Sequence, residues 1–320
     1  MNCDIVNHII KKAKKILIVT HINPDGDTLG SMCGLATLIR ENFKKECDLL
    51  VDNLPQAFEF LPLIKNVKYF DSIDKSLVYD LVITVDVAGL ERIEEVKIFL
   101  EKASVTLNID HHATNTSFAQ ENIIVPDASS TGEVIASIAF ENKWRVTFES
   151  ALALYTAILT DTGSFKFSNT SAKTFNIVSK LLEYGVKPNE VYERCFESYP
   201  KNFFRFQNYC LNKAVFLLDD KVCYTEIYKK DIEKFGVGAD CTEGLTEKLR
   251  AISSTEIAFI AKEIAQGVTK FSMRSRNVDV SEICAIFGGG GHKLASGCVI
   301  KASLKNSVEK VLAQIEKMEL

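Results

Sequence analysis

Acidic and histidine side chains follow apolar runs at four places in this chain. These places are the segment His21–Asp27, the single residue Asp86, the tripeptide Asp110-His111-His112 and the acidic residue Asp161. In open α/β sheets, side chains just beyond the carboxyl ends of strands form the binding site. Four such groups therefore predict one centre rich in carboxylate and imidazole, which suits a two-metal phosphoester hydrolase.

Asp25 and Asp27 flank Gly26, which permits a tight turn, and we expect them to address two neighbouring ions bridged by Asp86. Paired cations about 3.5–4 Å apart clamp a phosphate, activate a water and neutralise the leaving oxygen. Mixed imidazole and carboxylate donors favour manganese, iron or cobalt over calcium or magnesium. Taken singly, Asp25-Gly26-Asp27 could be only a turn, Asp86 a helix N-cap and Asp161 a helix end. Their co-occurrence favours the metal site.

A glycine run near the C-terminus forms a second candidate site. It consists of Gly288, Gly289, Gly290 and Gly291, and His292 follows it. Without Cβ atoms, the main-chain N–H groups of such a run can approach an anion closely. Arg274 and Ser275 lie in the segment Met273–Arg276, and arginine binds phosphate through paired hydrogen bonds. We therefore predict that Arg274, Ser275, the glycine run and His292 bind substrate. The alternative for the glycines is a flexible loop.

Strand-like and helical segments alternate through the first half of the chain. Strands are expected at Ile16–Thr20, Cys47–Val51, Tyr79–Val85 and Val105–Ile109. Helices are expected at Leu29–Asn42, Arg92–Leu100, Ser130–Asn142, Glu149–Leu159 and Ser171–Tyr184. This alternation predicts βαβ units around a parallel sheet.

The pattern changes near residue 186. Further helices are expected at Pro188–Phe196, Asn202–Asn212, Leu245–Ile252, Val280–Phe287 and Ser307–Met318. Further strands are expected at Ala214–Leu218, Lys221–Ile227, Ile257–Ile264, Lys270–Arg274 and Ala295–Ile300. The chain is therefore predicted to be α/β, with a parallel-sheet catalytic domain over 1–187 and a helical linker over 188–213. A smaller mixed α/β substrate-binding domain is expected over 214–320.

Composition narrows the class of protein. A chain of 320 residues has room for two domains, and its net charge of −4 argues against a broad duplex-binding surface. The nine cysteines include no Cys-x-x-Cys pair, so we expect buried thiols in a reducing cytosol rather than a zinc site. The N-terminal segment lacks the apolar core of a signal peptide, and no window reaches the roughly 18–20 apolar residues of a membrane span. We expect a soluble, cytoplasmic protein without a membrane partner.

The four acidic and histidine segments resemble motifs I to IV of the DHH phosphoesterase superfamily, in this order along the chain. Thr28 replaces the alanine often seen after motif I, a departure that we expect to be conservative. The stretch from Gly244 to Gly297, with its Gly288–His292 signature, resembles the DHH-associated domain that follows many DHH domains. Together the two resemblances point to the compact NrnA-type oligoribonucleases.

The resemblance implies roles for individual residues. One Mn²⁺ is expected on His21, Asp25 and Asp86, and a second on Asp27, Asp86, His111 and Asp161. The expected catalytic residues are Asp86 as the bridging ligand, Asp110 orienting an imidazole, and His112 facing the substrate phosphate.

The implied activity is that of a manganese-dependent phosphoesterase. Its substrates would be single-stranded RNAs of about two to five nucleotides, cleaved to mononucleotides in a site of limited length. It would also dephosphorylate adenosine 3′,5′-bisphosphate (pAp) to AMP. One alternative is a phosphodiesterase for cyclic di-AMP or the dinucleotide pApA. Another is a nucleotide-binding regulatory protein without turnover. A homodimer is expected from the same resemblance.

Overall fold

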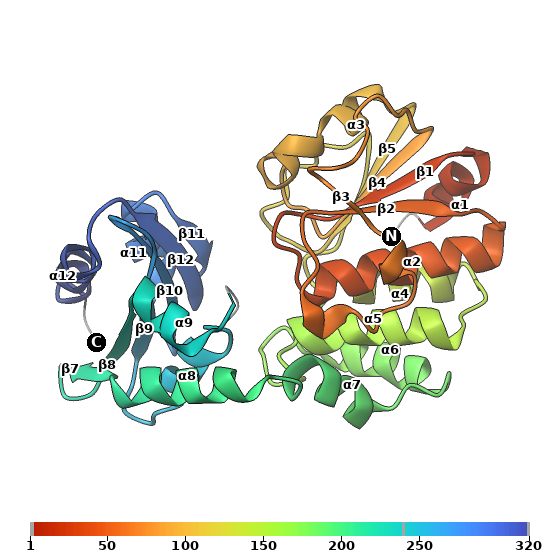
Figure 1. The fold of residues 1–320 in the computed structure, drawn as a ribbon. Helices are drawn as coiled ribbons and strands as arrows, with labels where there is room; N and C mark the ends of the chain where they lie inside the picture. Colours follow the sequence, from red (N-terminus) through yellow and green to blue (C-terminus); the bar gives the residue numbers. More distant parts are fainter. Residues whose placement is uncertain (1–2, 239–240, 319–320) are drawn as a thin grey trace. The chain divides into compact units, whose positions relative to one another are not determined.

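The computed structural model describes residues 3–238 and 241–318 and contains two compact units (Figure 1). The first extends to Ser198, and the second begins at Tyr199. Each unit has its own six-stranded sheet and its own helices. The predicted α/β class, with a parallel sheet first and a mixed sheet second, is confirmed.

All the strands of the first sheet run parallel, in the order β3-β2-β1-β4-β5-β6. Their bounds are β1 (Ile16–Val19), β2 (Cys47–Val51), β3 (Lys68–Tyr69), β4 (Leu81–Val85), β5 (Val105–Asp110) and β6 (Glu121–Ile124). The short edge strands β3 and β6 were not predicted. The strand order reverses between β1 and β4, and doubly wound sheets bind ligands beyond the carboxyl ends at this reversal.

Helices cover the first sheet on both faces (Figure 1). They are α1 (Cys3–Lys12), α2 (Gly26–Phe43), α3 (Ile98–Lys102), α4 (Thr131–Glu141), α5 (Phe148–Asp161), α6 (Ala172–Leu182) and α7 (Pro188–Phe196). Three short 3-10 helices complete the unit, η1 (Gln56–Phe58), η2 (Ile64–Asn66) and η3 (Leu90–Val96). The single helix predicted at Arg92–Leu100 is wrong. The chain forms η3 and then α3, with non-helical angles at Ile93, whose buried side chain packs in the core.

The central strands are buried on both faces because helices lie on both sides of the sheet. Ile16 and Ile18 of β1 belong to the apolar core that includes residues of α2, α4 and α5. Leu17 and Val19 belong to the separate core on the other face. A strand buried on both faces reads as a continuous apolar run rather than an alternating one, and β1 follows this rule.

Helices α2 and α5 approach each other closely at small residues. A Cβ atom added to Gly30 would lie 2.6 Å from the Ala153 carbonyl oxygen and 2.9 Å from the Ala157 Cβ. A Cβ added to Gly34 would lie 2.6 Å from a methyl carbon of Leu154. This close packing fixes the position of α2, and with it the acidic residues at the start of that helix.

The second unit has a mixed sheet in the order β11-β12-β10-β9-β8-β7, in which only β8 and β9 are paired in parallel. Its strands are β7 (Val215–Leu217), β8 (Val222–Ile227), β9 (Ile257–Ala265), β10 (Val268–Ser275), β11 (Gly290–His292) and β12 (Ala295–Ile300). Its helices are α8 (Lys201–Asn212), α9 (Lys229–Phe235), α10 (Leu245–Arg250), α11 (Val280–Ile286) and α12 (Leu304–Ile315). Helix α9 and strand β11 were not predicted.

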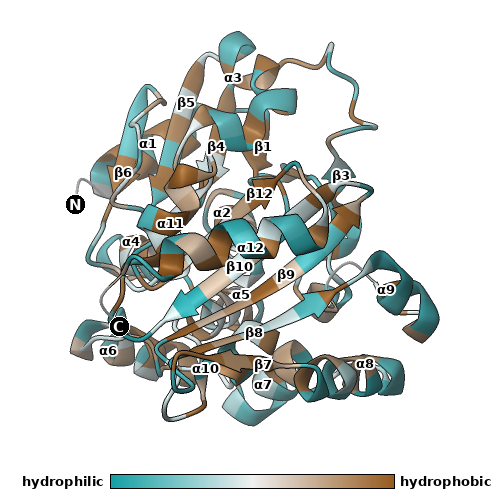
Figure 2. Ribbon diagram, turned by 90° about the vertical axis from the view of Figure 1, so that its left-hand side faces the viewer, coloured by the Kyte–Doolittle hydropathy of each residue, from teal (hydrophilic) through white to brown (hydrophobic). Residues whose placement is uncertain are grey.

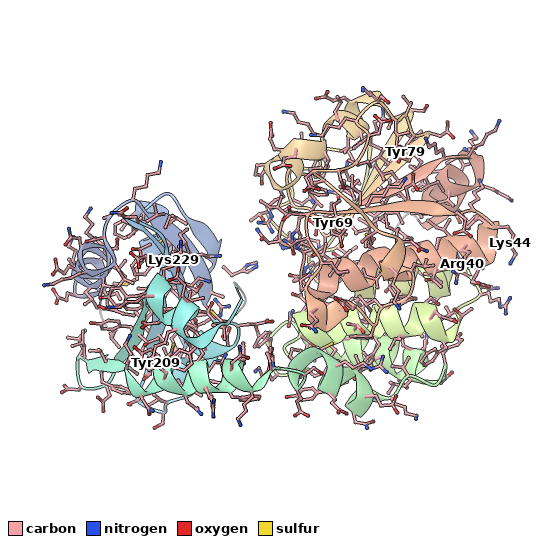
Figure 3. All side chains as sticks on the ribbon, viewed as in Figure 1. Arg40, Lys44, Tyr69, Tyr79, Tyr209 and Lys229 are labelled. Carbon is pink, nitrogen blue, oxygen red and sulfur yellow. The ribbon has the colours of Figure 1, made fainter. Side chains whose placement is uncertain are left out.

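Two apolar cores cover the two faces of the second sheet. One joins the strands to α11 and α12, and Figure 2 shows α12 crossing the strands. The other joins them to α8 and α10. The aromatic-basic segment of α8 contributes Phe206, which is fully buried, to this core. Phe203 of the same segment is also buried, whereas Phe204 is half-exposed. Tyr209, labelled in Figure 3, donates a hydrogen bond of 3.0 Å to Asp231 Oδ1 on α9.

Within the residues that the structure describes, no helix is long and apolar enough to cross a membrane.

Replacement of Gly30 by alanine tests the α2–α5 contact. The added methyl group meets backbone atoms, so we expect the free energy of unfolding to fall by about 1–3 kcal/mol, as in other overpacked cores. Urea unfolding followed by the fluorescence of Trp144, the single tryptophan, reports on the first unit. Asp71→Ala, at an exposed side chain of the same unit, is the control. An unchanged transition in the Gly30 variant would contradict the packing described.

Candidate metal centre

The predicted ligands meet at the carboxyl end of the parallel sheet, where the strand order reverses. His21 follows β1, Asp86 follows β4, and His111 follows the last residue of β5. Helix α2 begins at Gly26, earlier than predicted, so Asp25 is its N-cap and accepts a hydrogen bond from the Thr28 N–H. The segment around Asp25 is therefore the first turn of a helix and not an isolated turn.

Three groups of side chains have ligand atoms within 4.8 Å of one another, and the third of them, Asp86, His111 and His112, shares one residue with each of the others. The first contains His21, Asp25 and Asp86, and the second contains Asp27, His111 and Asp161. His111 Nε2 lies 3.8 Å from Asp27 Oδ2 and 3.6 Å from Asp161 Oδ2. All six metal ligands predicted from the sequence are brought together in the structure.

Asp86 lies between the two groups and faces each with a different oxygen. Its Oδ2 is 3.6 Å from His21 Nε2, and its Oδ1 is 3.7 Å from His111 Nε2. The residue is almost fully buried, and its backbone has a left-handed φ of 61°. It does not cap a helix, because the N-cap of η3 is Gly89. A left-handed non-glycine residue costs about 1–3 kcal/mol and persists only where its surroundings hold it.

The N-terminus of α4 holds two of the carboxylates. The N–H groups of Thr131 and Gly132 donate to the Asp27 carboxylate at 2.7 and 3.0 Å. The Thr131 hydroxyl donates to Asp86 Oδ1 at 3.0 Å. Unpaired N–H groups and the helix dipole favour negative charge at this end of a helix. Thr131 was not predicted as a site residue, although the Ser130-x-x-Glu133 pattern is a sign of a helix start.

Asp110 is fully buried and holds the second histidine of its tripeptide. Its Oδ1 lies 2.8 Å from His112 Nδ1 and also accepts the His111 N–H at 2.8 Å. Its Oδ2 accepts a hydrogen bond of 2.5 Å from the Asn115 amide. The imidazole that Asp110 orients is thus that of His112. The His111 ring lies with Nδ1 3.2 Å from the Ala128 carbonyl oxygen.

The acidic cluster perturbs the proton affinity of its members in opposite directions. Burial, with a contribution from nearby carboxylates, raises the pKa of Asp161 to about 7 and raises the pKa of Asp27 well above its ordinary value. Burial alone would also raise the pKa of Asp86, but the neighbouring histidines hold it below its usual range. The hydrogen bond to Asp110 raises the pKa of His112 to about 9.

This donor set fits divalent cations. The ligand atoms are imidazole nitrogens and carboxylate oxygens, a mixture that suits manganese, iron or cobalt. Burial and mutual repulsion raise the pKa of Asp27 and Asp161, and bound cations would relieve the repulsion. The two groups and the shared Asp86 match a site for two ions.

In the second unit, register places Arg274 and His292 in one row of the sheet. Arg274 pairs with Ala295, and Ala295 pairs with His292, so the three residues point to the same face of adjacent strands. Two strand spacings separate the outer pair by about 10 Å. The guanidinium of Arg274 also donates to Glu247 Oε1 at 2.8 Å.

The glycine run is not a loop throughout, because Gly290 and Gly291 belong to strand β11. A Cβ at Gly289 would lie 2.2 Å from the Gly297 carbonyl oxygen, so close strand packing requires this glycine. Gly288, with a φ of 72°, follows α11 in a left-handed conformation. Gly288, Gly290 and Gly291 are exposed.

Two polar residues near Arg274 are occupied within the fold. Ser275 is buried, and its hydroxyl donates to the Val278 carbonyl oxygen at 2.5 Å. Arg276 donates to the carbonyl oxygens of Thr255, Arg250 and Ile252 at 2.9 to 3.1 Å. Arg276 therefore holds the end of α10 and is not the solvated side chain that a surface arginine would be.

Comparisons with known proteins agree with this geometry. Residues 15–158 match the family model described as "DHH family, N-terminal domain", and residues 219–318 match the DHHA1 domain.

Two curated relatives and one crystal structure match most of the chain. The "Bifunctional oligoribonuclease and PAP phosphatase NrnA" of Thermus thermophilus is 29% identical, over 94% of this chain and 89% of the relative. The protein of the same name in Mycoplasma genitalium is 31% identical, over 91% and 90% of the two chains. The crystal structure of an exopolyphosphatase-related protein from Bacteroides fragilis has a TM-score of 0.93 and 26% identity, covering 98% and 95%.

The raised pKa values predict how the metal-free protein responds to pH. The pKa of Asp161 is about 7 in the fold against an ordinary value of 3.8, so its stabilising contribution is lost as pH rises through 7. His112 has a pKa of about 9 in the fold against an ordinary value of 6.5, so its stabilising contribution is lost as pH rises from 6.5 through 9. We expect the melting temperature of chelator-treated protein to fall by at least about 3 °C between pH 5 and 9. Asp161→Asn should reduce the fall in melting temperature below pH 7. A melting temperature that rises over this range would contradict the assignment.

Proposed function

The chain belongs to the DHH phosphoesterase family, and within it we propose an enzyme that hydrolyses short oligoribonucleotides to mononucleotides and dephosphorylates pAp to AMP. The proposed cofactors are two Mn²⁺ ions. The proposed RNA substrates are about two to five nucleotides long, the size range of a site that encloses most of its ligand. The names of the two relatives join these two activities, and both activities break phosphate ester bonds.

The position of Asp86 carries this proposal. A carboxylate that turns one oxygen to His21 and the other to His111 suits a ligand shared by two ions. We assign His21, Asp25 and Asp86 to one ion, and Asp27, Asp86, His111 and Asp161 to the other. Bound in pairs, such ions polarise a phosphate ester and lower the pKa of water, so that hydrolysis proceeds at neutral pH.

We assign His112 to the reacting phosphate. Its Nδ1 is held by Asp110, and its Nε2 lies on the opposite side of the ring. A pKa of about 9 keeps the ring protonated at neutral pH. A fixed, protonated imidazole donates to phosphate oxygens as negative charge develops on them. Asn115 and the buried Asp110 keep the ring in this orientation.

We assign the recognition of a further substrate phosphate to the second unit. Arg274 and His292 share one face of its sheet, and the exposed glycines Gly290 and Gly291 belong to the same strand as His292. Arginine forms paired hydrogen bonds with phosphate. Ser275 supports this site through its hydrogen bond to Val278. The expected homodimer and cytoplasmic location stay predictions.

A side-by-side turnover assay in Mn²⁺ tests the proposal, with short RNAs, pAp, pApA and cyclic di-AMP as substrates. We expect short RNAs and pAp to be turned over fastest. Asp86→Ala should lower every rate by about a thousandfold or more, because it removes the shared ligand. Asp71→Ala, at an exposed carboxylate that is not among the proposed ligands, should retain wild-type rates.

Two outcomes would contradict the proposal. Wild-type rates in the Asp86 variant would remove the two-metal assignment. A preference for cyclic di-AMP or pApA over other short RNAs would keep the metal site and replace the substrate with a second messenger.

Arg274→Ala tests recognition separately from chemistry. We expect KM to rise about tenfold and kcat to change little, because a remote phosphate contact contributes mainly to binding. Lys270→Ala is the matched control, since Lys270 is an exposed cation on the same strand and face. Steady-state kinetics with a short RNA measure both constants. A fall in kcat at unchanged KM would show that Arg274 acts in the transition state.

A further inference from the structure

The hydroxyl group of Thr28 lies among the three predicted ligands of the first ion. Its Oγ1 is 2.7 Å from His21 Nε2, 3.0 Å from Asp25 Oδ1 and 2.6 Å from Asp86 Oδ2. The residue is fully buried in the first turn of α2. From the sequence we expected Thr28 to be a conservative replacement. In the structure its side chain contacts all three members of the first group.

The hydroxyl contacts this group and reaches the second only through the shared Asp86, whose Oδ2 it contacts rather than the Oδ1 that faces His111. In the described part of the chain, Thr28 has no hydrogen bond to Asp27, His111 or Asp161, the members of the second group. Any effect of the hydroxyl on cation binding should therefore fall on one of the two ions.

A cation and this hydroxyl compete for the same three ligand atoms. The three atoms turn toward Thr28 Oγ1, so at least some of these contacts must break before all three atoms can bind an ion. The loss of a hydrogen bond to a charged group opposes binding. The Thr28 N–H bond to Asp25 is independent of the side chain, so it survives removal of the hydroxyl.

We propose that Thr28 is a positioning residue that holds His21, Asp25 and Asp86 together in the metal-free protein and weakens the binding of the first ion. This inference rests on the proposed metal chemistry. It adds that the two sites bind their ions with different affinities. The ion on the second group binds tightly and the ion on the first group binds weakly, because in the first group one hydroxyl contacts all three ligand atoms. In the second group the Ser31 and Thr131 hydroxyls each contact a single carboxylate oxygen. The two sites should therefore fill in sequence as the Mn²⁺ concentration rises.

Calorimetric titration of chelator-treated protein with Mn²⁺ tests the inference in wild type, Thr28→Ala and Thr28→Ser. We expect Thr28→Ala to tighten the weaker site about tenfold, which corresponds to about 1.4 kcal/mol. The tighter site should not change. Thr28→Ser keeps the hydroxyl and should resemble wild type. The melting temperature of the metal-free alanine variant should fall, because the hydrogen bonds to the three ligands are lost.

Thr37→Ala is the matched control. Thr37 is another fully buried threonine of α2, and its hydroxyl donates to the Cys33 carbonyl oxygen, away from the ligands. Its loss should leave both affinities unchanged.

The outcomes separate this inference from the function it rests on. Wild-type protein could bind two Mn²⁺ ions while Thr28→Ala binds the weaker one with unchanged or lower affinity. That result would overturn the inference and leave the metal centre intact. If Thr28→Ser bound Mn²⁺ as tightly as Thr28→Ala, the inference would also be overturned, because the hydroxyl would not be what weakens binding. Wild-type protein that binds no Mn²⁺ would overturn the metal chemistry and the inference together.

Discussion

The repulsion among buried carboxylates is the constraint on which the rest of the first unit depends. Asp27 and Asp86 are almost fully buried, and Asp25 and Asp161 lie beside them in the two ligand groups. Such charges stay together only where donors or cations surround them. The N-terminus of α4, the hydroxyl groups of Thr131 and Thr28, and the histidines supply the donors.

The topology of the sheet explains why these groups converge. Strands β1 and β4 are neighbours although they lie far apart in sequence, and their carboxyl ends point in the same direction. Side chains that follow them must therefore meet at the reversal of the strand order. The left-handed backbone of Asp86 is held there by its N–H bond to the Ile109 carbonyl oxygen and by its hydroxyl partners.

The second unit illustrates how one sequence feature can serve two purposes. Gly289 is required by the close approach of Gly297 and Cys298, which is a matter of packing. A Cβ added to Gly290 would meet no neighbouring atom, so packing does not require a glycine there. What the glycine provides at this position is an exposed main chain. Of the polar residues near Arg274, Ser275 and Arg276 bond within the fold, and the strand register places Arg274 and His292 on one face of the sheet.

The sequence by itself determined the fold class, and it predicted a centre of carboxylates and histidines whose side chains the structure brings together. Apolar runs such as Ile16–Val19 are local signals, and the residues that follow them are known once the strand ends are known. The order and types of His21, Asp86 and His111 therefore sufficed to predict a shared centre. The edge strand β6 and the helix break at Ile93 escaped prediction, because pairing and core packing decide them.

Only the tertiary structure decided which groups hold the ligands in place. Thr131 lies more than a hundred residues from Asp27, and no local pattern links them. Thr28 looked neutral because a threonine in a helix is common, yet folding brings His21 and Asp86 to its hydroxyl. The sequence also did not decide whether Asp110 pairs with the ring of His111 or of His112. The directions of adjacent side chains depend on the folded backbone, which here pairs Asp110 with His112. Long-range contacts of this kind depend on the path of the whole chain.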